Sequence, residues 1–344
     1  MFFPVLFGGN DEAACPLFSY SALPSESIWK DMQYSDGYFV ACGSRQDGAA
    51  PTIAYSDDYG VTWNNGVGAL SNTNLWDNIT KLGSTWLSVA VNTTLGRVYQ
   101  KSTDAINWTN GSLTGLSAQS DTCGRLTGLI TDTVNSRFVM MLEVNDNQFG
   151  GNTFYASADG IAWTRYNLLP STARWKSIAC NDTHIVAISW NTSGSDYKAA
   201  YSPISTYRTN TWTASTLPTS SPADGWFHVI WTGTCFFATT KSTDTIGARS
   251  YDGGATWETV TLPHDMNDNP MCANTVTGKL FLVCNDLNNE PRKYFTSIDD
   301  GDTWTECAII DGSWSVFATD GERHVVTSTG TTATWDDQVA YHIP

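Results

Sequence analysis

Two acidic side chains, Glu143 and Asp146, form the pair of carboxyl groups in this sequence that comes closest to a hydrolytic site. Hydrolysis of a glycosidic bond uses one carboxyl group as acid and another as nucleophile or base, roughly 5 to 9.5 Å apart. The sequence contains no G-x-S-x-G nucleophile elbow, no H-E-x-x-H zinc motif and no glycine-rich phosphate loop. We assign no catalytic residue, and a glycoside hydrolase stays an alternative to a protein that only binds.

Tryptophan and arginine form a second set of candidates, because flat rings stack on sugars and guanidinium groups bind carboxylate or sulfate. The tryptophans open short apolar segments, so their rings are either exposed platforms or buried seals between neighbouring units. The arginines either hold an anion or are solvated and balance nearby aspartates. The predicted ligand-binding residues are Trp76, Trp175, Trp226, Trp314, Arg97, Arg125 and Arg292. Trp29, Arg45, Arg174 and Arg249 are expected on the same face or at its rim.

A third candidate is a short motif that occurs three times in full, as SDDYGVTW at 56–63, SYDGGATW at 250–257 and SIDDGDTW at 297–304. Its carboxylate and hydroxyls could do chemistry, but a catalytic site is needed once, whereas a turn is needed in every structural unit. The Asp can accept backbone N–H groups across a turn, the Gly allows a positive φ, and the Trp can pack between sheets. Repetition therefore favours a structural role.

Shorter copies of the motif occur at 102–108 and 157–163, and an eroded copy ends at Trp212. The residues predicted to build these turns are Ser56, Asp58, Gly60, Thr62, Trp63, Asp104, Trp108, Asp159, Trp163, Ser250, Asp252, Gly254, Thr256, Trp257, Ser297, Asp299, Gly301, Thr303 and Trp304. Successive closing tryptophans are 45 to 55 residues apart. Seven apolar openings and seven apolar runs precede them, which indicates seven units of four short antiparallel strands.

The two ends of the chain predict how these units close into a ring. The last unit supplies a third strand, TATWDD at 332–337, and then lacks a fourth. The segment LFSYSALPSESIW at 17–29 matches the fourth strand and linker of other units, such as AWTRYNLLPSTARW at 162–175. We therefore predict an all-β, seven-bladed β-propeller of four-stranded antiparallel blades over 17–344, closed by residues 17–22, with a separate strip at 1–16.

The motif S-x-D-x-G-x-T-W resembles the Asp-box of sialidase-like and related β-propellers. The resemblance implies that the motif forms the hairpin between the third and fourth strands of a blade. Sialidases of this kind also use an arginine triad, a Tyr and Glu pair, an acid/base Asp and an Arg-Ile-Pro motif near the N-terminus. This sequence has no Arg-Ile-Pro, and its first arginine is Arg45. The resemblance therefore implies a non-catalytic branch of the family.

The composition of the chain limits the kinds of partner that the protein is expected to bind. The chain has 34 Asp and Glu against 18 Lys and Arg, which argues against binding to nucleic acid phosphates or to an anionic membrane surface. No apolar run reaches the roughly 18 residues needed to span a bilayer, and the opening MFFPVLFGGN lacks the basic start of a secretory signal. The eight cysteines are expected to be buried free thiols. No metal or cofactor is expected, since Pro270 follows DMNDN where a calcium loop requires Gly.

These observations favour a non-enzymatic recognition or structural propeller. The first interpretation is a phage virion component, such as a tail fibre or host-contacting protein, made in the host cytoplasm. The apolar strip FFPVLFGG would dock it on another virion subunit, and loops on one face would bind a cell-surface glycan. An assembly factor resembling the photosystem II stability propellers is a further alternative, although the sequence shows no targeting segment and no broad basic face.

Overall fold

The computed structural model describes residues 18–24, 28–44, 52–70, 78–92, 96–116, 126–142, 151–190, 198–218, 225–240, 245–264, 271–284, 293–308, 314–328 and 338–343. Over these ranges the chain forms β-strands and turns and no helix. None of the described residues belongs to a helical segment that could cross a membrane.

The strands form seven separate four-stranded antiparallel sheets, which are the blades. Blade 1 contains β2 (Ile28–Ser35), β3 (Tyr38–Ser44), β4 (Ile53–Ser56) and β5 (Asn64–Asn65). Blade 2 contains β6 (Asn78–Leu82), β7 (Thr85–Asn92), β8 (Gly96–Ser102) and β9 (Thr109–Ser112). Blade 3 contains β10 (Leu126–Asp132), β11 (Arg137–Leu142), β12 (Phe154–Ser157) and β13 (Thr164–Tyr166). Blade 4 contains β14 (Arg174–Cys180), β15 (His184–Trp190), β16 (Lys198–Pro203) and β17 (Thr213–Thr216).

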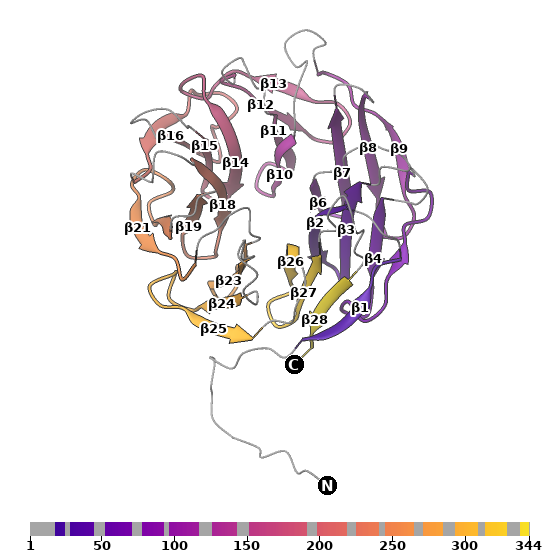
Figure 1. Cartoon of the computed structure of the whole chain (residues 1–344). Helices are drawn as coiled ribbons and strands as arrows, with labels where there is room; N and C mark the ends of the chain where they lie inside the picture. Colours follow the sequence, from indigo (N-terminus) through magenta and orange to yellow (C-terminus); the bar gives the residue numbers. More distant parts are fainter. Residues whose placement is uncertain are drawn as a thin grey trace.

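The remaining blades follow the same order. Blade 5 contains β18 (Trp226–Trp231), β19 (Phe236–Thr240), β20 (Ile246–Ser250) and β21 (Glu258–Thr261). Blade 6 contains β22 (Met271–Asn274), β23 (Lys279–Cys284), β24 (Lys293–Ser297) and β25 (Thr305–Ala308). Blade 7 contains β26 (Trp314–Thr319), β27 (His324–Ser328), β28 (Gln338–His342) and β1 (Ser19–Ala22). The first strands contact one another in the cyclic order β2, β6, β10, β14, β18, β22, β26 and β2, so the blades form the closed ring seen in Figure 1. The predicted seven-bladed β-propeller is confirmed.

The ring closes through the N-terminal strand, as predicted. β1 pairs with β28 in an antiparallel register that places Ser19 opposite Tyr341 and Ala22 opposite Gln338. The third strand of this blade is 338–342, so its predicted position at 332–337 is wrong; residues 331–337 lie outside the described ranges. Val339 and Ala340 are fully buried, and these apolar side chains fill the sheet where TATWDD would have placed polar ones. The strip at 1–16 also lies outside the described residues.

The hydrophobic core consists of seven layers, each between two neighbouring blades. In the layer between blades 7 and 1, for example, Trp29 packs with Val325 and Val339. Burial of whole tryptophan and phenylalanine rings dominates the stability of such layers, at about 25 cal/mol per Å² of apolar surface. Because both faces of every sheet are covered, blade-to-blade packing fixes the direction of the loops at each end.

The repeated motif forms the hairpin between the third and fourth strands, and its polar groups bond one another. In the first copy the Ser56 hydroxyl donates to Asp58 at 2.8 Å, and the Gly60 N–H donates to Ser56 Oγ at 2.8 Å. Asp58 also accepts the N–H of Thr62 at 2.8 Å and its hydroxyl at 2.6 Å. The Trp63 indole N–H donates to the Gly60 carbonyl at 3.1 Å.

The same bonds recur in the copies at 250–257 and 297–304. In the shortened copies, Asn107 replaces the threonine as donor to Asp104, and two backbone N–H groups donate to Asp159. Each of these turns is thus held by its own polar groups.

The glycine of each full motif also contacts the preceding blade. At Gly60 (φ +90°) an added Cβ would lie 3.0 Å from Val325 in blade 7, and at Gly301 (φ +89°) it would lie 2.8 Å from Phe237 in blade 5. The motif therefore closes a hairpin and seats it on its neighbour. We call the end of the ring that carries these turns the motif face, and the opposite end the loop face.

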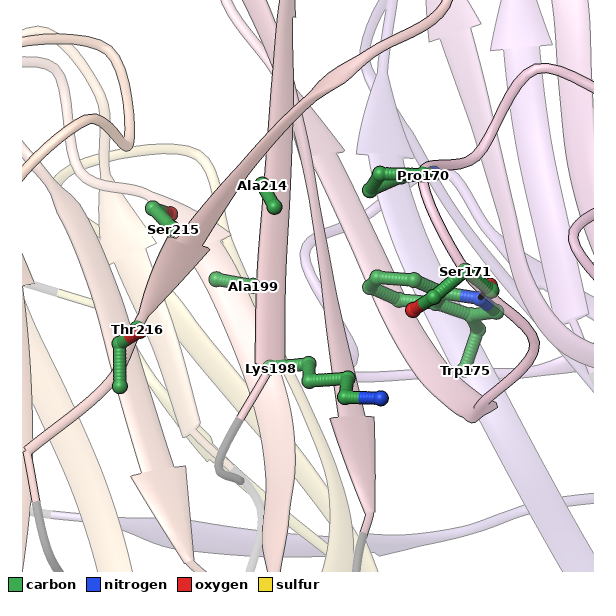
Figure 2. Close-up of a pocket in the computed structure, with 8 residues that line it drawn as sticks. All are labelled: Pro170, Ser171, Trp175, Lys198, Ala199, Ala214, Ser215 and Thr216. Carbon is green, nitrogen blue, oxygen red and sulfur yellow. Dashed lines mark hydrogen bonds between the residues drawn. The ribbon is translucent and has the colours of Figure 1, made fainter. Parts of the chain in front are cut away.

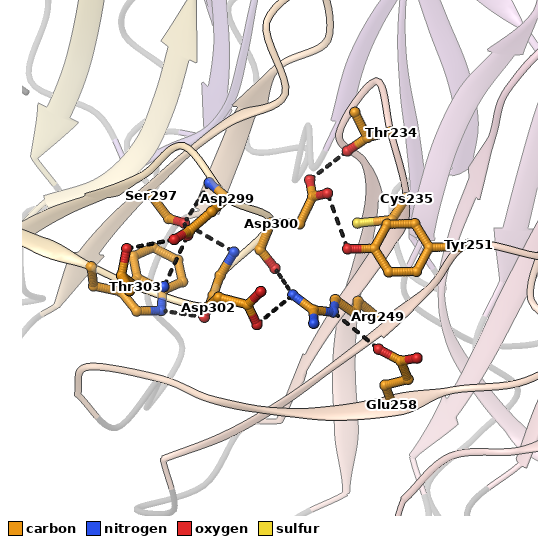
Figure 3. A network of polar contacts seen from close by, with 12 residues as sticks. Thr234, Cys235, Arg249, Tyr251, Glu258, Ser297, Asp299, Asp300, Asp302 and Thr303 are labelled. Carbon is orange, nitrogen blue, oxygen red and sulfur yellow. Dashed lines mark hydrogen bonds and ion pairs between the residues drawn. The ribbon is translucent and has the colours of Figure 1, made fainter. Parts of the chain in front are cut away.

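Blades 5 and 6 are further joined on the motif face by the polar network of Figure 3. Asp300 of blade 6 accepts the hydroxyl of Thr234, and also that of Tyr251 at 3.1 Å. Arg249 donates to the Asp302 carboxylate at 2.8 Å and to the Asp300 carbonyl at 3.2 Å. The prediction that Arg249 lies on the loop face is wrong, because it stands at the motif end of β20.

The cysteines differ in part from expectation. Cys180, Cys235 and Cys272 carry free thiols, and burial raises the pKa of the Cys235 thiol to about 11. Cys307 is disulfide-bonded, so the expectation of free thiols throughout is wrong. A core of this size needs no staple, and the sequence spacing gave no indication of this one.

Candidate functional site: the loop-face end of blade 4

The loop-face end of blade 4 brings together side chains from all four of its strands. At this end of the blade the first strand, β14, begins and the second strand, β15, ends, and Arg174 of β14 is paired with Trp190 of β15. The third starts there and the fourth ends there, with Lys198 of β16 paired to Thr216 of β17. Antiparallel pairing thus places three cationic or aromatic side chains at one edge, although they are up to 24 positions apart in the chain.

Inner strands start with a β-bulge in five blades, with the irregularities at Trp29/Asp31, Leu126/Gly128, Trp175/Ser177, Trp226/His228 and Trp314/Val316. A bulge adds one residue and re-aims its side chain, and bulges are common beside binding sites. In blades 4 and 5 the added residues are Lys176 and Phe227.

The residue that follows the bulge ties neighbouring inner strands together. Ser177 Oγ accepts the N–H of Val229 in blade 5 at 3.0 Å. In blade 1 the Asp31 carboxylate similarly accepts the N–H of Ile79 in blade 2 at 2.9 Å. These bonds join the inner strands of neighbouring blades beside the bulged residues.

Lys176 and Phe227 belong to a group of cations and rings that we call the mouth cluster, formed by Arg174, Lys176, Trp190 and Phe227. The Arg174 guanidinium lies 4.5 Å from the centre of the Trp190 ring, and the Lys176 ammonium lies 5.1 Å from it. The Lys176 ammonium is also 5.5 Å from the Phe227 ring, which meets Trp190 edge-on at 6.4 Å. All four side chains are half-buried, so each keeps an accessible surface.

A pocket lies on the other side of blade 4, toward blade 3, and we call it the crevice pocket. Its volume is about 280 Å³, and its lining includes Pro170, Ser171, Trp175, Lys198, Ala214 and Thr216. Figure 2 shows Lys198 extending from β16 toward the side on which Trp175 and Ser171 lie. The Trp175 indole N–H donates to the Ser171 carbonyl at 3.3 Å, so the polar edge of this ring is already satisfied.

The predicted tryptophans stand where expected, at the loop-face starts of inner strands, but they are buried. Trp29, Trp226 and Trp314 are fully buried and Trp175 is 3% exposed. Of the two alternatives, the structure shows the buried one for these rings, which seal one blade against the next. Trp175 is nevertheless one of the residues that line the crevice pocket. Trp76 lies outside the described residues.

Of the three predicted arginines, Arg97 is the one in the described part of the chain. It is the second residue of β8 in blade 2, where it pairs with Val91 at the loop-face end. Arg125 and Arg292 lie outside the described ranges, as do Arg45, Glu143 and Asp146. Of the arginines expected near this face, Arg174 is the one that joins the mouth cluster.

Sequence reasoning missed Trp190, Lys176 and Phe227. Trp190 ends the apolar run at 184–190, and its last position in the strand leaves it half-buried. The signal for Lys176 was present, because the same Trp-Lys pair opens blade 1 at 29–30 and blade 4 at 175–176, and both pairs carry the bulge. A recurring extra residue after the buried tryptophan would have indicated a re-aimed side chain.

The carboxyl groups with a resolved pKa shift in the described part of the chain are hydrogen-bond acceptors. The group comprises Asp36, Asp58, Asp104, Asp159, Asp252, Asp299 and Asp320, and each has a lowered pKa. At Asp58 burial alone would raise the pKa, but the bonds from Thr62 and Ser56 outweigh it. A general acid needs a raised pKa, so these carboxylates are suited to structure instead. The described residues contain no cluster of three or more metal-ligating side chains.

Neither a protein-family model nor a curated protein sequence matches the chain. Among solved structures, the chain is similar to selenomethionine-substituted virginiamycin B lyase from Staphylococcus aureus. The TM-score is 0.64 and the sequence identity 12%, over 95% of this chain and 99% of that chain. Identity this low shows a shared fold alone, so the comparison supports the propeller and assigns no activity.

Proposed function

We propose that this propeller is a non-enzymatic recognition protein that binds an acidic glycan through the mouth cluster. The observation that carries the proposal is the half-buried Trp190 ring, which has two cations and a second aromatic ring around it. Indole and phenyl faces stack on the apolar face of a sugar, and ammonium and guanidinium groups attract its carboxylate or sulfate.

The surroundings of the cluster support binding over bond cleavage. The cluster stands on inner strands that bond to each other through residues such as Ser177, so little ordering is required when a ligand binds. The protein carries a net charge of −16, and a local pair of cations in such a molecule favours an anion at that position over the rest of the surface.

We further propose that the protein is a component of a phage virion, with the strip at 1–16 docking it to another subunit. The composition rich in Thr, Asn, Ser and Gly, the repeated turn motif that resembles the Asp-box, and the apolar strip support this assignment. It predicts that neighbouring genes encode capsid, portal or tail proteins; a neighbourhood of metabolic genes would contradict it.

The binding proposal is tested by retention on immobilised saccharides. We expect the protein to be retained by immobilised sialyllactose or heparin and not by immobilised lactose, with affinity falling at least about tenfold in an Arg174→Gln, Lys176→Gln variant. The matched control is Arg208→Gln, which removes a cation 5.6 Å from the Tyr207 ring in the same blade but at the motif-face end. Equal retention of both variants, or retention by none of the acidic saccharides, would overturn the proposal.

A further inference from the structure

We propose that the crevice pocket between blades 3 and 4 is a second binding site, for a ring-shaped carboxylate about as large as one uronic acid unit. It goes beyond the proposed function, because it is a separate site on the opposite side of blade 4. Trp175 packs into the layer between blades 3 and 4, whereas Trp190 meets Phe227 of blade 5. The pocket volume of about 280 Å³ is near the lower end of ligand pockets, which are roughly 300 to 1,000 Å³.

One wall of the pocket is apolar. The indole N–H of Trp175 is bonded to the Ser171 carbonyl, so what the indole offers the pocket is carbon surface. Pro170 and Ala214 add further apolar surface around it. A sugar ring can place its C–H groups against such a wall without leaving a protein donor unsatisfied.

Among the described residues that line the pocket, Lys198 is the one charged side chain and none carries a carboxylate. Within the described part of the protein, the Lys198 ammonium makes no hydrogen bond and no ion pair. Lys81 and Lys101 differ, since Lys81 bonds the Asp36 carboxylate at 2.6 Å and Lys101 bonds the Asp159 carbonyl at 2.6 Å. An ammonium that stands beside an apolar wall and is not neutralised favours an anion.

Two hydroxyls complete the polar lining. Ser171 and Thr216 border the pocket, and their side chains can bond the hydroxyls of a sugar. Ser215 is also among the lining residues, but its hydroxyl is committed to the Gly254 carbonyl of blade 5 at 2.6 Å. An apolar wall with one cation and two hydroxyls is the kind of site that binds a small polar ring with one negative charge.

The test is a titration followed by saturation-transfer difference NMR, with glucuronate as the probe and glucose as its neutral counterpart. We expect glucuronate to bind a protein whose mouth cluster is removed by Arg174→Gln and Lys176→Gln, and glucose to bind it at least about tenfold more weakly. Lys198→Gln should weaken glucuronate binding about tenfold, and Ala214→Leu should abolish it by filling the pocket. Both changes leave the buried Trp175 ring in place.

The matched control is Thr213→Leu, on the same strand and equally exposed. Thr213 is two residues from Ser215 and therefore shares its orientation toward blade 5, away from the pocket, so this variant should bind as its parent does. All of these variants are made in an Arg174→Gln, Lys176→Gln background, so that glucuronate held by the mouth cluster does not contribute to the signal. In that background, equal binding of glucose and glucuronate, no binding of glucuronate, or retained binding in Ala214→Leu would each overturn the proposal.

Discussion

The two faces of the ring are built from the same strands and differ in how their polar groups are satisfied. On the motif face the Asp of each full copy of the repeated turn is bonded by its own Ser and Thr, as in Asp58 with Ser56 and Thr62. On the loop face the cations of the mouth cluster lie over aromatic rings, and Lys198 stands beside an apolar pocket wall. Repeated residues thus stabilise the ring, and residues that occur once offer binding groups.

The largest expected effect concerns acid stability and comes from His324 at the motif-face start of β27. Burial first, then the charges of His342 and Lys279, lower the pKa of His324 to about 3, and its Nδ1 has no hydrogen-bond partner among the described residues. The unfolded chain, with a histidine pKa of about 6.5, therefore binds more protons than the folded protein between these values. The stabilising contribution is complete above about pH 6.5 and decreases as pH falls toward 3.

The contribution lost over this range is on the order of 3 to 5 kcal/mol as an upper bound. Urea unfolding at pH values from 7 to 4 should show it as a falling midpoint. A His324→Phe variant, whose ring can pack with Phe281 and Phe317, should have a much flatter dependence above pH 4. An unchanged slope in this variant would show that other groups set the acid sensitivity of the motif face.

The next prediction distinguishes two roles of the motif glycine, which are to allow the turn and to contact the preceding blade. Gly37 and Gly301 both lie on the motif face with φ near +87°, but an added Cβ at Gly37 meets nothing within 4 Å, whereas at Gly301 it lies 2.8 Å from Phe237. Gly37→Ala should cost about 1 to 2 kcal/mol for backbone strain alone. Gly301→Ala should cost about 3 kcal/mol or more, because overpacking against blade 5 is added.

Thermal and urea unfolding of the two variants measure this difference. The circular dichroism of both should remain that of a β-protein, because the other blades keep their own turns. Equal destabilisation by the two changes would show that the motif glycine serves the hairpin alone and does not seat it on the preceding blade.

The sequence predicted the motif face well because its bonds are local. Ser, Asp, Gly and Trp lie within eight residues, so their spacing reports the turn directly, and the repeat fixes the number of blades. The strand at 338–342 was missed because TATWDD resembles the third strand of blade 1, whereas the apolar pair Val339 and Ala340 determined the pairing.

The loop face could be predicted less well because its contacts are not local. Trp190 and Phe227 are 37 positions apart and come together only through the packing of two blades. The sequence places these tryptophans at the starts of strands. It does not show whether a neighbouring blade covers their rings. The bulge after Trp175 decides that, since it turns Lys176 outward while the indole stays inside.

The smallest expected effect on stability comes from a comparison of one cation on each face. Arg249 on the motif face has a side chain 14% exposed and bonds the Asp302 carboxylate at 2.8 Å and Glu258 at 3.4 Å (Figure 3). Arg249→Gln should lower the free energy of unfolding by about 1 to 2 kcal/mol, because the Asp300 carbonyl and two exposed carboxylates lose a charged donor. Lys176→Gln on the loop face should lower it by less than about 1 kcal/mol, since it removes only cation–ring contacts at a half-buried position.

Urea midpoints of the two variants at pH 7 give this comparison directly, and the m-values should match that of the wild type. The functional consequence runs in the opposite order, because Lys176→Gln should weaken retention on acidic saccharides while Arg249→Gln leaves it unchanged. If the loss of Lys176 destabilised the ring as strongly as the loss of Arg249, its position over Trp190 would be a structural requirement. The distinction between a stabilising face and a binding face would then no longer hold.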